Sequence, residues 1–329
     1  MNTEVPLDPT SGSSFVYSSV TRIADLESGD YQIEERPFRA WATGDYAAAR
    51  VIEPPGGLNQ IELPNGRMRE VFEGDVIVGA LGRRAATREA TGTWEEVEQN
   101  RRLHALTSAG LLGKLVSKSA HLPSLLEVEY LGHLCRMDEK LAMGDYVDVP
   151  ADRAEPEIPI VLMVGTSMAA GKTTAARTVI RELKRVELDV LGAKMSGAGR
   201  YRDILSMQDA GADVVFDFVD GGLPSTVCSE QRYDDTLRYL LDRMAGTDAD
   251  VGVIEIGASP LEPYNGERAI RALLDQIRCT VLSASDPYAV VGVMKAFDMK
   301  PDLVAGLATS TEAGIELVDE LTGIPALNV

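Results

Sequence analysis

The sequence predicts an α/β protein in which a parallel sheet with helices on both faces follows a smaller β-rich domain. Two observations lead to this prediction. Across residues 159–329, short apolar runs alternate with helix-like segments, a pattern typical of parallel sheets. Across residues 15–148, short apolar or alternating segments are separated by glycine-containing turns, which indicates a β-rich region.

The C-terminal region begins with the segment IPIVLMVGTSMAAGKTTAAR at residues 158–177. Its apolar run, 158–164, predicts a buried strand, and a helix is expected from Lys172 to about Arg185. A glycine-bounded loop, 165–171, joins them. Strand, loop, Gly-Lys-Thr and helix together predict a phosphate-binding loop, and hence a parallel sheet of the P-loop NTPase type.

The chemistry expected of this loop follows from its backbone and from two side chains. Amide groups of the loop and of the first helical turn point toward one small volume and carry partial positive charge. Lys172 adds a full charge for terminal phosphates, and the Thr173 hydroxyl can complete a Mg²⁺ shell. The expected phosphate-binding residues are Gly165, Thr166, Ser167, Met168, Ala169, Ala170, Gly171, Lys172, Thr173 and Thr174.

Three further residues are candidates at neighbouring strand ends. Glu255 ends the run 249–255, an apolar strand that closes with an acid, and is the first choice for a metal-bound or water-orienting acid; the alternative is a solvent-facing acid. Lys194 follows the strand predicted at 190–193 and either neutralises a phosphoryl group or is simply solvated. Asp203 begins a helical pattern, where it caps the helix or reaches Mg²⁺.

From these positions we expect catalysis by Lys172, Lys194 and Glu255, and metal binding by Thr173, Asp203 and Glu255. Further along the chain, Asp286, Pro287 and Tyr288 follow the strand predicted at 280–284. They are either substrate-pocket residues or a helix start with proline in its first turn, and the second interpretation is favoured. The remaining predicted elements are strands at 214–219 and 303–307 and helices at 233–244 and 267–276.

The N-terminal region is predicted to be a small barrel or sandwich over residues 15–148. Its signals are a buried strand at 76–81, an Asn-Gly hairpin turn at residues 65–66 and a short helix near 94–102. Residues 1–14 are polar and predict a flexible arm. The acidic, proline-containing run DVPADRAEPEIP predicts a linker at 149–158, before the P-loop α/β domain at 159–329.

Composition narrows the classes of partner. The net charge is −19, with 32 basic and 51 acidic residues spread over both halves, which argues against nucleic acid or an anionic membrane as partner. No run approaches about 18 apolar residues, and no signal peptide is evident. Three widely spaced cysteines predict a reducing, cytoplasmic location. We expect a small-molecule substrate and a homo-oligomer.

The C-terminal region resembles two P-loop families. Residues 165–173 resemble the G-T-x-x-x-x-G-K-T loop of dethiobiotin synthetase-like ligases and amidotransferases. Lys194 stands where that family has a strand-end lysine, residues 203–208 are similar to its D-A-L-x-L-Q segment, whose Asp binds Mg²⁺, and Glu255 resembles the acid of its V-E-G-A-G segment. The resemblance implies ATP, Mg²⁺ and phosphate transfer to a carboxylate or carbamate.

The second resemblance is to a P-loop family that is in part D-glutamate N-acetyltransferase-like. Residues 217–222 and 253–266 are similar to its D-F-x-x-G and V-E-G-Q-G-S-L-x-H-P-x-Y-S-G segments. It implies an acyl-CoA donor, such as acetyl-CoA, whose phosphates occupy the loop. The chain departs from these patterns at Ser167, where both families often carry Asp, and at Ile256, where they have Gly. Thr309 replaces the Asn that reads adenine in the ligases.

Three functional hypotheses follow for the C-terminal region. The first is an ATP- and Mg²⁺-dependent ligase or kinase acting on a small molecule. The second is an acyl-CoA-dependent N-acyltransferase on the same scaffold. The third is a nucleotide-binding regulatory protein, because one scaffold hosts several functions.

Overall fold

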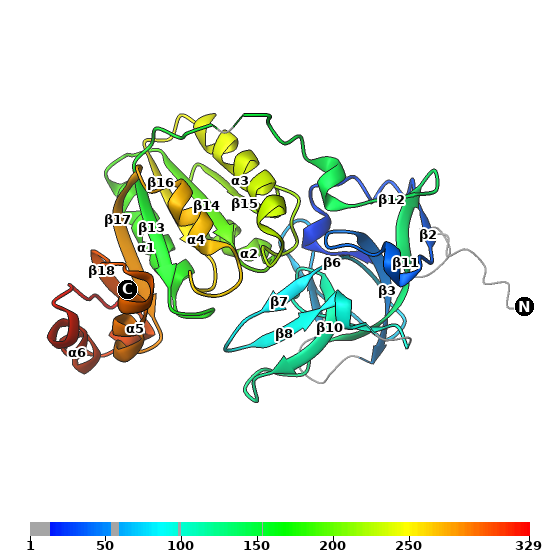
Figure 1. Cartoon of the computed structure of the whole chain (residues 1–329), viewed down its shortest axis with the longest axis horizontal. Coiled ribbons are helices and arrows are strands. Elements are labelled where there is room, and N and C mark those ends of the chain that lie inside the picture. The colour runs from blue at the N-terminus through cyan, green and yellow to red at the C-terminus, as the bar shows by residue number, and fades with distance from the viewer. Residues whose placement is uncertain (1–13, 54–58, 98–99, 153) are drawn as a thin grey trace, which may run out of the picture.

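The computed structural model describes residues 14–53, 59–97, 100–152 and 154–329. The arm predicted at 1–14 lies almost entirely outside the described residues. Figure 1 shows a mixed α/β part and a β-rich part lying side by side, with the C-terminus on the α/β part.

Six parallel strands form the sheet of the α/β part, in the order β15-β14-β16-β13-β17-β18. The strands are β13 (Ile160–Gly165), β14 (Val190–Ser196), β15 (Val214–Asp217), β16 (Val251–Ile256), β17 (Ile277–Ala284) and β18 (Leu303–Gly306). The helices are α1 (Lys172–Arg185), α2 (Tyr201–Asp209), α3 (Glu230–Ala245), α4 (Gly266–Ala272), α5 (Pro287–Phe297) and α6 (Glu312–Thr322). Strand β13, which leads into the predicted phosphate loop, lies between β16 and β17.

Helices cover both faces of this sheet, which explains why its strands are apolar without alternation. On β13, Met163 packs in one hydrophobic cluster with Ala176 of α1 and Met207 of α2. Leu162, on the opposite face, packs in another cluster with Leu240 of α3. A parallel sheet with helices on both faces was the fold predicted for residues 159–329, and it is confirmed.

Several predicted bounds differ from the observed ones. Strand β17 begins at Ile277 rather than at 280, and helix α3 begins at Glu230 rather than at 233. Strand β14 runs on to Ser196 rather than stopping at 193, because Lys194 pairs with Asp217 of β15 and Glu255 of β16. Strand β15 stops at Asp217 rather than at 219, and helix α4 stops at Ala272 rather than at 276. Sequence patterns place such ends less well than they place the elements themselves.

The β-rich part closes on itself. Strand β6 pairs with β3, β3 with β11, β11 with β9, β9 with β10, and β10 returns to β6, so five strands make a ring. This ring is a barrel rather than a sandwich. Its strands and their neighbours are β1 (Phe15–Tyr17), β2 (Gln32–Glu34), β3 (Tyr46–Glu53), β4 (Gln60–Glu62), β5 (Met68–Glu70), β6 (Val76–Leu81), β7 (Arg83–Ala85), β8 (Ala90–Thr93), β9 (Arg102–Ala105), β10 (Leu111–Lys118), β11 (Glu127–Arg136) and β12 (Glu139–Lys140).

Strand β6, which the sequence predicted to be buried, is buried at all six positions. The Asn-Gly turn also forms as predicted: β4 pairs with β5, and Gly66 has a φ of +81°. The helix predicted near 94–102 is wrong. Only a 3-10 turn forms, at Trp94–Glu96, and strand β9 already begins at Arg102; residues 98–99 lie outside the described part. The other 3-10 turns are Ser19–Thr21, Phe38–Ala40, Met143–Tyr146 and Leu307–Thr309.

The two parts share a hydrophobic core. One face of β6 points into the barrel through Ile77, whereas Val78 on its other face joins the cluster that contains Phe218 and Tyr233 of the α/β part. Residues before and after the segment 149–158 both belong to this core. The division of the chain into separate domains at that segment therefore stays a prediction. None of the helices in the described ranges is both long and apolar enough to cross a membrane.

A buried ion pair also joins the parts. Arg22, beside the first 3-10 turn, donates to Asp217 at 2.6 Å and to Asp220 at 2.9 Å. The Asp217 side chain is fully buried, and its carboxylate also accepts the Val219 N–H. Removing one partner of a buried pair leaves an uncompensated charge, which costs far more than the intact pair contributes.

Replacing Arg22 tests this contact. Arg22→Met should lower the unfolding free energy by about 3–5 kcal/mol, because the carboxylate of Asp217 stays buried without its cation. The matched control is Arg39→Met, at an exposed arginine of the same part, which should change stability by about 0.5 kcal/mol or less. Urea denaturation measures both variants, and equal effects would contradict the assignment.

Candidate functional site

The predicted phosphate loop joins β13 to α1, and its glycines are needed sterically. Gly171 has a φ of +104°, and a Cβ there would lie 3.0 Å from the Cα of Gly306. A Cβ on Gly165 would lie 2.7 Å from Cδ of Lys172. Glycine at residue 165 therefore leaves room for the observed path of the Lys172 side chain, which a Cβ would force to shift.

Lys172 is held inside this loop. Its ammonium group donates to the carbonyl oxygens of Ser167 at 2.8 Å and Ala258 at 2.9 Å, and only 5% of the residue is exposed. Burial lowers the pKa of Lys172, and the charge of Glu255 opposes this shift only in part. A desolvated ammonium beside the loop amides is suited to binding an anion.

The carboxyl ends of β14 and β16 bring the other predicted residues together. Lys194 and Glu255 occupy paired positions on these adjacent strands. The Glu255 carboxylate, 2% exposed, accepts the Thr173 hydroxyl at 2.9 Å. Lys194 forms an ion pair with Asp203 of α2. Burial alone would lower the pKa of Lys194, but the carboxylates of Asp203 and Glu255 outweigh it, so that pKa is raised.

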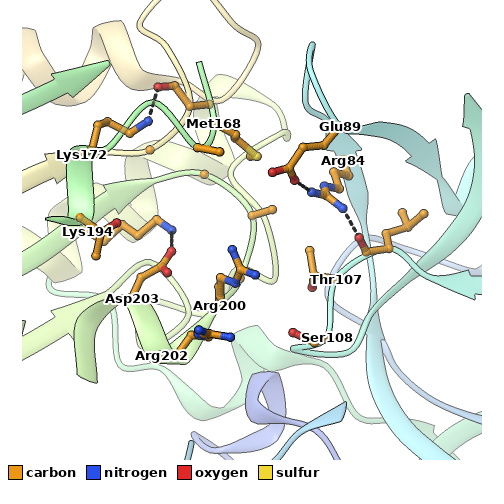
Figure 2. Close-up of a pocket in the computed structure, with 18 of the residues that line it drawn as sticks. Arg84, Glu89, Thr107, Ser108, Met168, Lys172, Lys194, Arg200, Arg202 and Asp203 are labelled. Atoms are coloured by element: carbon orange, nitrogen blue, oxygen red, sulfur yellow. Dashed lines mark hydrogen bonds and ion pairs between the residues drawn. The ribbon is translucent and has the colours of Figure 1, made fainter. Parts of the chain in front are cut away.

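These residues line one cavity of about 480 Å³ between the two parts of the protein. Figure 2 shows Lys172 and the Lys194–Asp203 pair on the α/β side of this pocket. The predicted site residues that line it are Met168, Ala169, Gly171, Lys172, Thr173, Thr174, Lys194, Asp203 and Glu255.

The other predicted loop residues do not line the cavity. The Thr166 hydroxyl accepts the Ser285 N–H at 3.1 Å, and Ser167 Oγ donates to its neighbour's carbonyl at Met168. Ala170 is fully buried. The side chains of these residues shape the loop. That their backbone N–H groups bind a ligand stays a prediction.

Sequence reasoning missed the residues that complete the pocket. Arg84, Glu89, Thr107 and Ser108 come from the β-rich part and line the side opposite α1 (Figure 2). No sequence signal marked these residues, because they reach the pocket only when the β-rich part packs against the α/β part in the folded chain. Two more lining residues are Arg200 and Arg202. Their signal was available, since Arg202 directly precedes Asp203, and Arg200 lies just before it, at the sheet edge where ligands were expected.

The segment 286–288 is the start of a helix, as the favoured of the two interpretations predicted, with proline in its first turn. The Asp286 carboxylate accepts the Ala289 N–H at 3.0 Å, and Pro287 is the first residue of α5. Tyr288 is exposed and lies outside the pocket lining. Thr309 is fully buried, with its hydroxyl 2.7 Å from the carbonyl oxygen of Leu327, so this hydroxyl is already satisfied.

The fit of a magnesium ion depends on oxygen atoms near the loop. No group of three or more His, Cys, Asp or Glu side chains within the described ranges could hold a metal ion by itself. Mg²⁺ beside phosphates needs only one or two protein oxygens, however, and the adjacent Thr173 hydroxyl and Glu255 carboxylate meet that need. Asp203 is occupied by Lys194, so its direct binding of a metal stays a prediction.

No protein-family model matches the chain, and no curated protein matches it. Among solved structures, the chain is similar to chloroplast FtsY from Physcomitrella patens, with 15% identity over 55% of this chain and 60% of that one, and a TM-score of 0.39. It is also similar to a ParA family ATPase from Chlorobium tepidum, with 13% identity over 52% and 83% and a TM-score of 0.32.

A third similar structure is the hydrogenase maturation factor HypB from Archaeoglobus fulgidus, with 13% identity over 52% of this chain and 80% of that one, and a TM-score of 0.34. The chain thus spans 60% of the FtsY chain. The fold assignment rests on the order of the six parallel strands and on the loop between β13 and α1.

The two lysines of the site should contribute oppositely to the pH dependence of stability. The folded-state pKa of Lys172 lies below its ordinary 10.5, so the unfolded chain binds more protons there and stability rises with pH within the window below 10.5. The folded-state pKa of Lys194 lies above 10.5, so its contribution is complete below that pH and is lost above it.

Urea denaturation of the wild type, Lys172→Met and Lys194→Met between about pH 7 and 10 checks this. The stability of the wild type relative to Lys172→Met should rise with pH, by at most about 1.4 kcal/mol per pH unit. Relative to Lys194→Met it should stay flat over the same range. Parallel profiles for the wild type and Lys172→Met would contradict the burial of a charged lysine.

Proposed function

We propose that this protein is an ATP- and Mg²⁺-dependent enzyme, a ligase or kinase that transfers phosphate to a carboxylate or carbamate of a small molecule. The observation that supports this most directly is the position of the cavity. It joins the buried Lys172 and the Thr173–Glu255 pair of the loop to a second wall from the β-rich part. Enzymes need such adjacent space for a second reactant, and phosphate binding alone does not.

The residues have distinct roles in this proposal. The loop amides and Lys172 bind the terminal phosphates of ATP. Thr173 and Glu255, with Asp203 as a further candidate, hold Mg²⁺, which supplies charge neutralisation when bound. Lys194, fixed by Asp203, stabilises negative charge on the transferring phosphoryl group.

The acyl-CoA-dependent N-acyltransferase is the second candidate, and one observation favours it. Leu106, Leu122, Leu125 and Met168 give one side of the cavity an apolar lining, which suits an acyl group. A nucleotide-binding regulatory role is the third candidate. The β-rich part contributes cavity wall rather than only a separate surface, which favours an enzyme over that role. A homo-oligomer stays a prediction.

Two substitutions test the leading proposal. Lys172→Ala should weaken Mg–ATP binding at least about 100-fold, since it removes a charged phosphate ligand. Glu255→Gln should leave binding within about threefold but lower turnover at least about tenfold. Calorimetry measures binding, and ADP release in the presence of small amines and carboxylic acids measures turnover. The control is Lys295→Ala, at an exposed lysine of α5.

The outcomes separate the three functions. Substrate-dependent ADP release that falls in Glu255→Gln supports the ligase or kinase. Release of free CoA from acetyl-CoA without nucleotide hydrolysis supports the acyltransferase. Mg–ATP binding without turnover on any small molecule supports the regulatory protein. An unchanged rate in Glu255→Gln would contradict the metal assignment.

A further inference from the structure

Two arginines in the pocket have no side-chain partner among the residues that the structure describes. Arg200 and Arg202 line the cavity, are exposed within it, and form no side-chain hydrogen bond or ion pair with any residue that the structure describes. Figure 2 shows both on the α/β side, facing the wall that carries Thr107 and Ser108. Their guanidinium groups are therefore available to a ligand.

The backbone that carries these arginines is fixed by the β-rich part. The fully buried Glu62 carboxylate accepts the N–H groups of Tyr201 at 2.8 Å and Arg202 at 2.9 Å. It thereby caps the start of α2, where the residue in the N-cap position, Arg200, makes no side-chain cap. One residue further, Asp203 is bound to Lys194. The arginines thus project from an anchored turn, which reduces the entropy lost on binding.

The facing wall contains polar atoms without partners. Thr107 Oγ1 is buried and makes no hydrogen bond in the described structure. Arg84, 8% exposed, donates to the carbonyl oxygen of Leu106 and pairs with Glu89, yet its buried Nε has no partner within the described ranges. Buried polar atoms are nearly always satisfied, so these two atoms leave unused hydrogen-bonding capacity in the wall that faces the arginines.

The charge of the cavity is opposite to that of the whole protein. Five basic side chains line it against three acidic ones, whereas the chain carries a net charge of −19. The pairs Lys194–Asp203 and Arg84–Glu89 compensate one another. With Lys172 assigned to the phosphates, the uncompensated positive charge lies at Arg200 and Arg202. Burial lowers the pKa of Arg84, and the charge of nearby Arg200 adds to that shift.

We propose that Arg200 and Arg202 form an anion subsite that holds a carboxylate or phosphate group of the small-molecule substrate, in the same cavity as the phosphate loop. Guanidinium groups bind both anions by charge-assisted hydrogen bonds, often bidentate. The Ser108 hydroxyl, on the facing wall of the cavity, is a further donor to the bound group. The subsite rests on the proposed function, because it is defined as the site of the second reactant beside the nucleotide.

The test uses the full chain with the loop already filled by Mg²⁺ and the β,γ-imido analogue of ATP. Calorimetric titration with succinate and with glycerol 3-phosphate then separates carboxylate from phosphate as the preferred group, and neutral succinamide is the blank. The variant is Arg200→Gln/Arg202→Gln. Its matched control, Arg177→Gln/Arg181→Gln, removes two exposed arginines of α1 that line no part of the cavity.

The wild type and the control pair should bind at least one anion with equal affinity, and Arg200→Gln/Arg202→Gln should weaken that binding at least about tenfold. Affinity for the ATP analogue should stay within about threefold in all variants. The inference would be overturned if the wild type bound neither anion, if both variant pairs lost binding equally, or if the arginine variant lost the nucleotide instead. Failure of the wild type to bind Mg²⁺ and the ATP analogue would instead overturn the proposed function, and the subsite with it.

Discussion

The structure depends on one buried charge, the ammonium group of Lys172. Removing an ammonium from water is costly unless polar atoms surround it, and here two backbone carbonyls and the nearby Glu255 carboxylate do so. Gly165 leaves room for the observed path of this side chain, and Gly171, with a φ of +104°, passes close to Gly306. A cation held this way favours the binding of an anion, because a phosphate beside it would provide the opposite charge that the buried ammonium lacks.

The β-rich part is tied to this site at several points rather than attached by a linker alone. Arg22 reaches the buried Asp217 at the end of β15, and Glu62 caps the helix that carries Asp203. The same part supplies one wall of the cavity. Positioning of the strand-end residues Lys194 and Asp203 therefore depends on packing between the parts, which links the stability of the barrel to the geometry of the site.

The sequence predicted those features of the fold and of the site that depend on residues close together in the chain. A buried strand, a glycine-bounded loop and Gly-Lys-Thr are neighbours in the chain, and parallel strands place Lys194 and Glu255 at one edge without further information. The closure of the barrel depends on β10 returning to β6, a long-range pairing that no short pattern encodes. Arg84 and Thr107 gave no signal for the same reason. Arg200 and Arg202 were within reach of the reasoning, because they adjoin Asp203, yet no motif marked them.

The central claim is that the amides ahead of Lys172 converge on a phosphate whose magnesium ion is held by side chains from α1 and β16. A crystal structure of the full chain with ADP and Mg²⁺ tests it most directly. We expect the diphosphate on residues 166–173, with Thr173 Oγ1 about 2.1 Å from the metal and the Glu255 carboxylate bound to it directly or through water. A nucleotide bound elsewhere, or Lys172 still bonded to Ser167 and Ala258 beside a phosphate-free loop, would contradict the account.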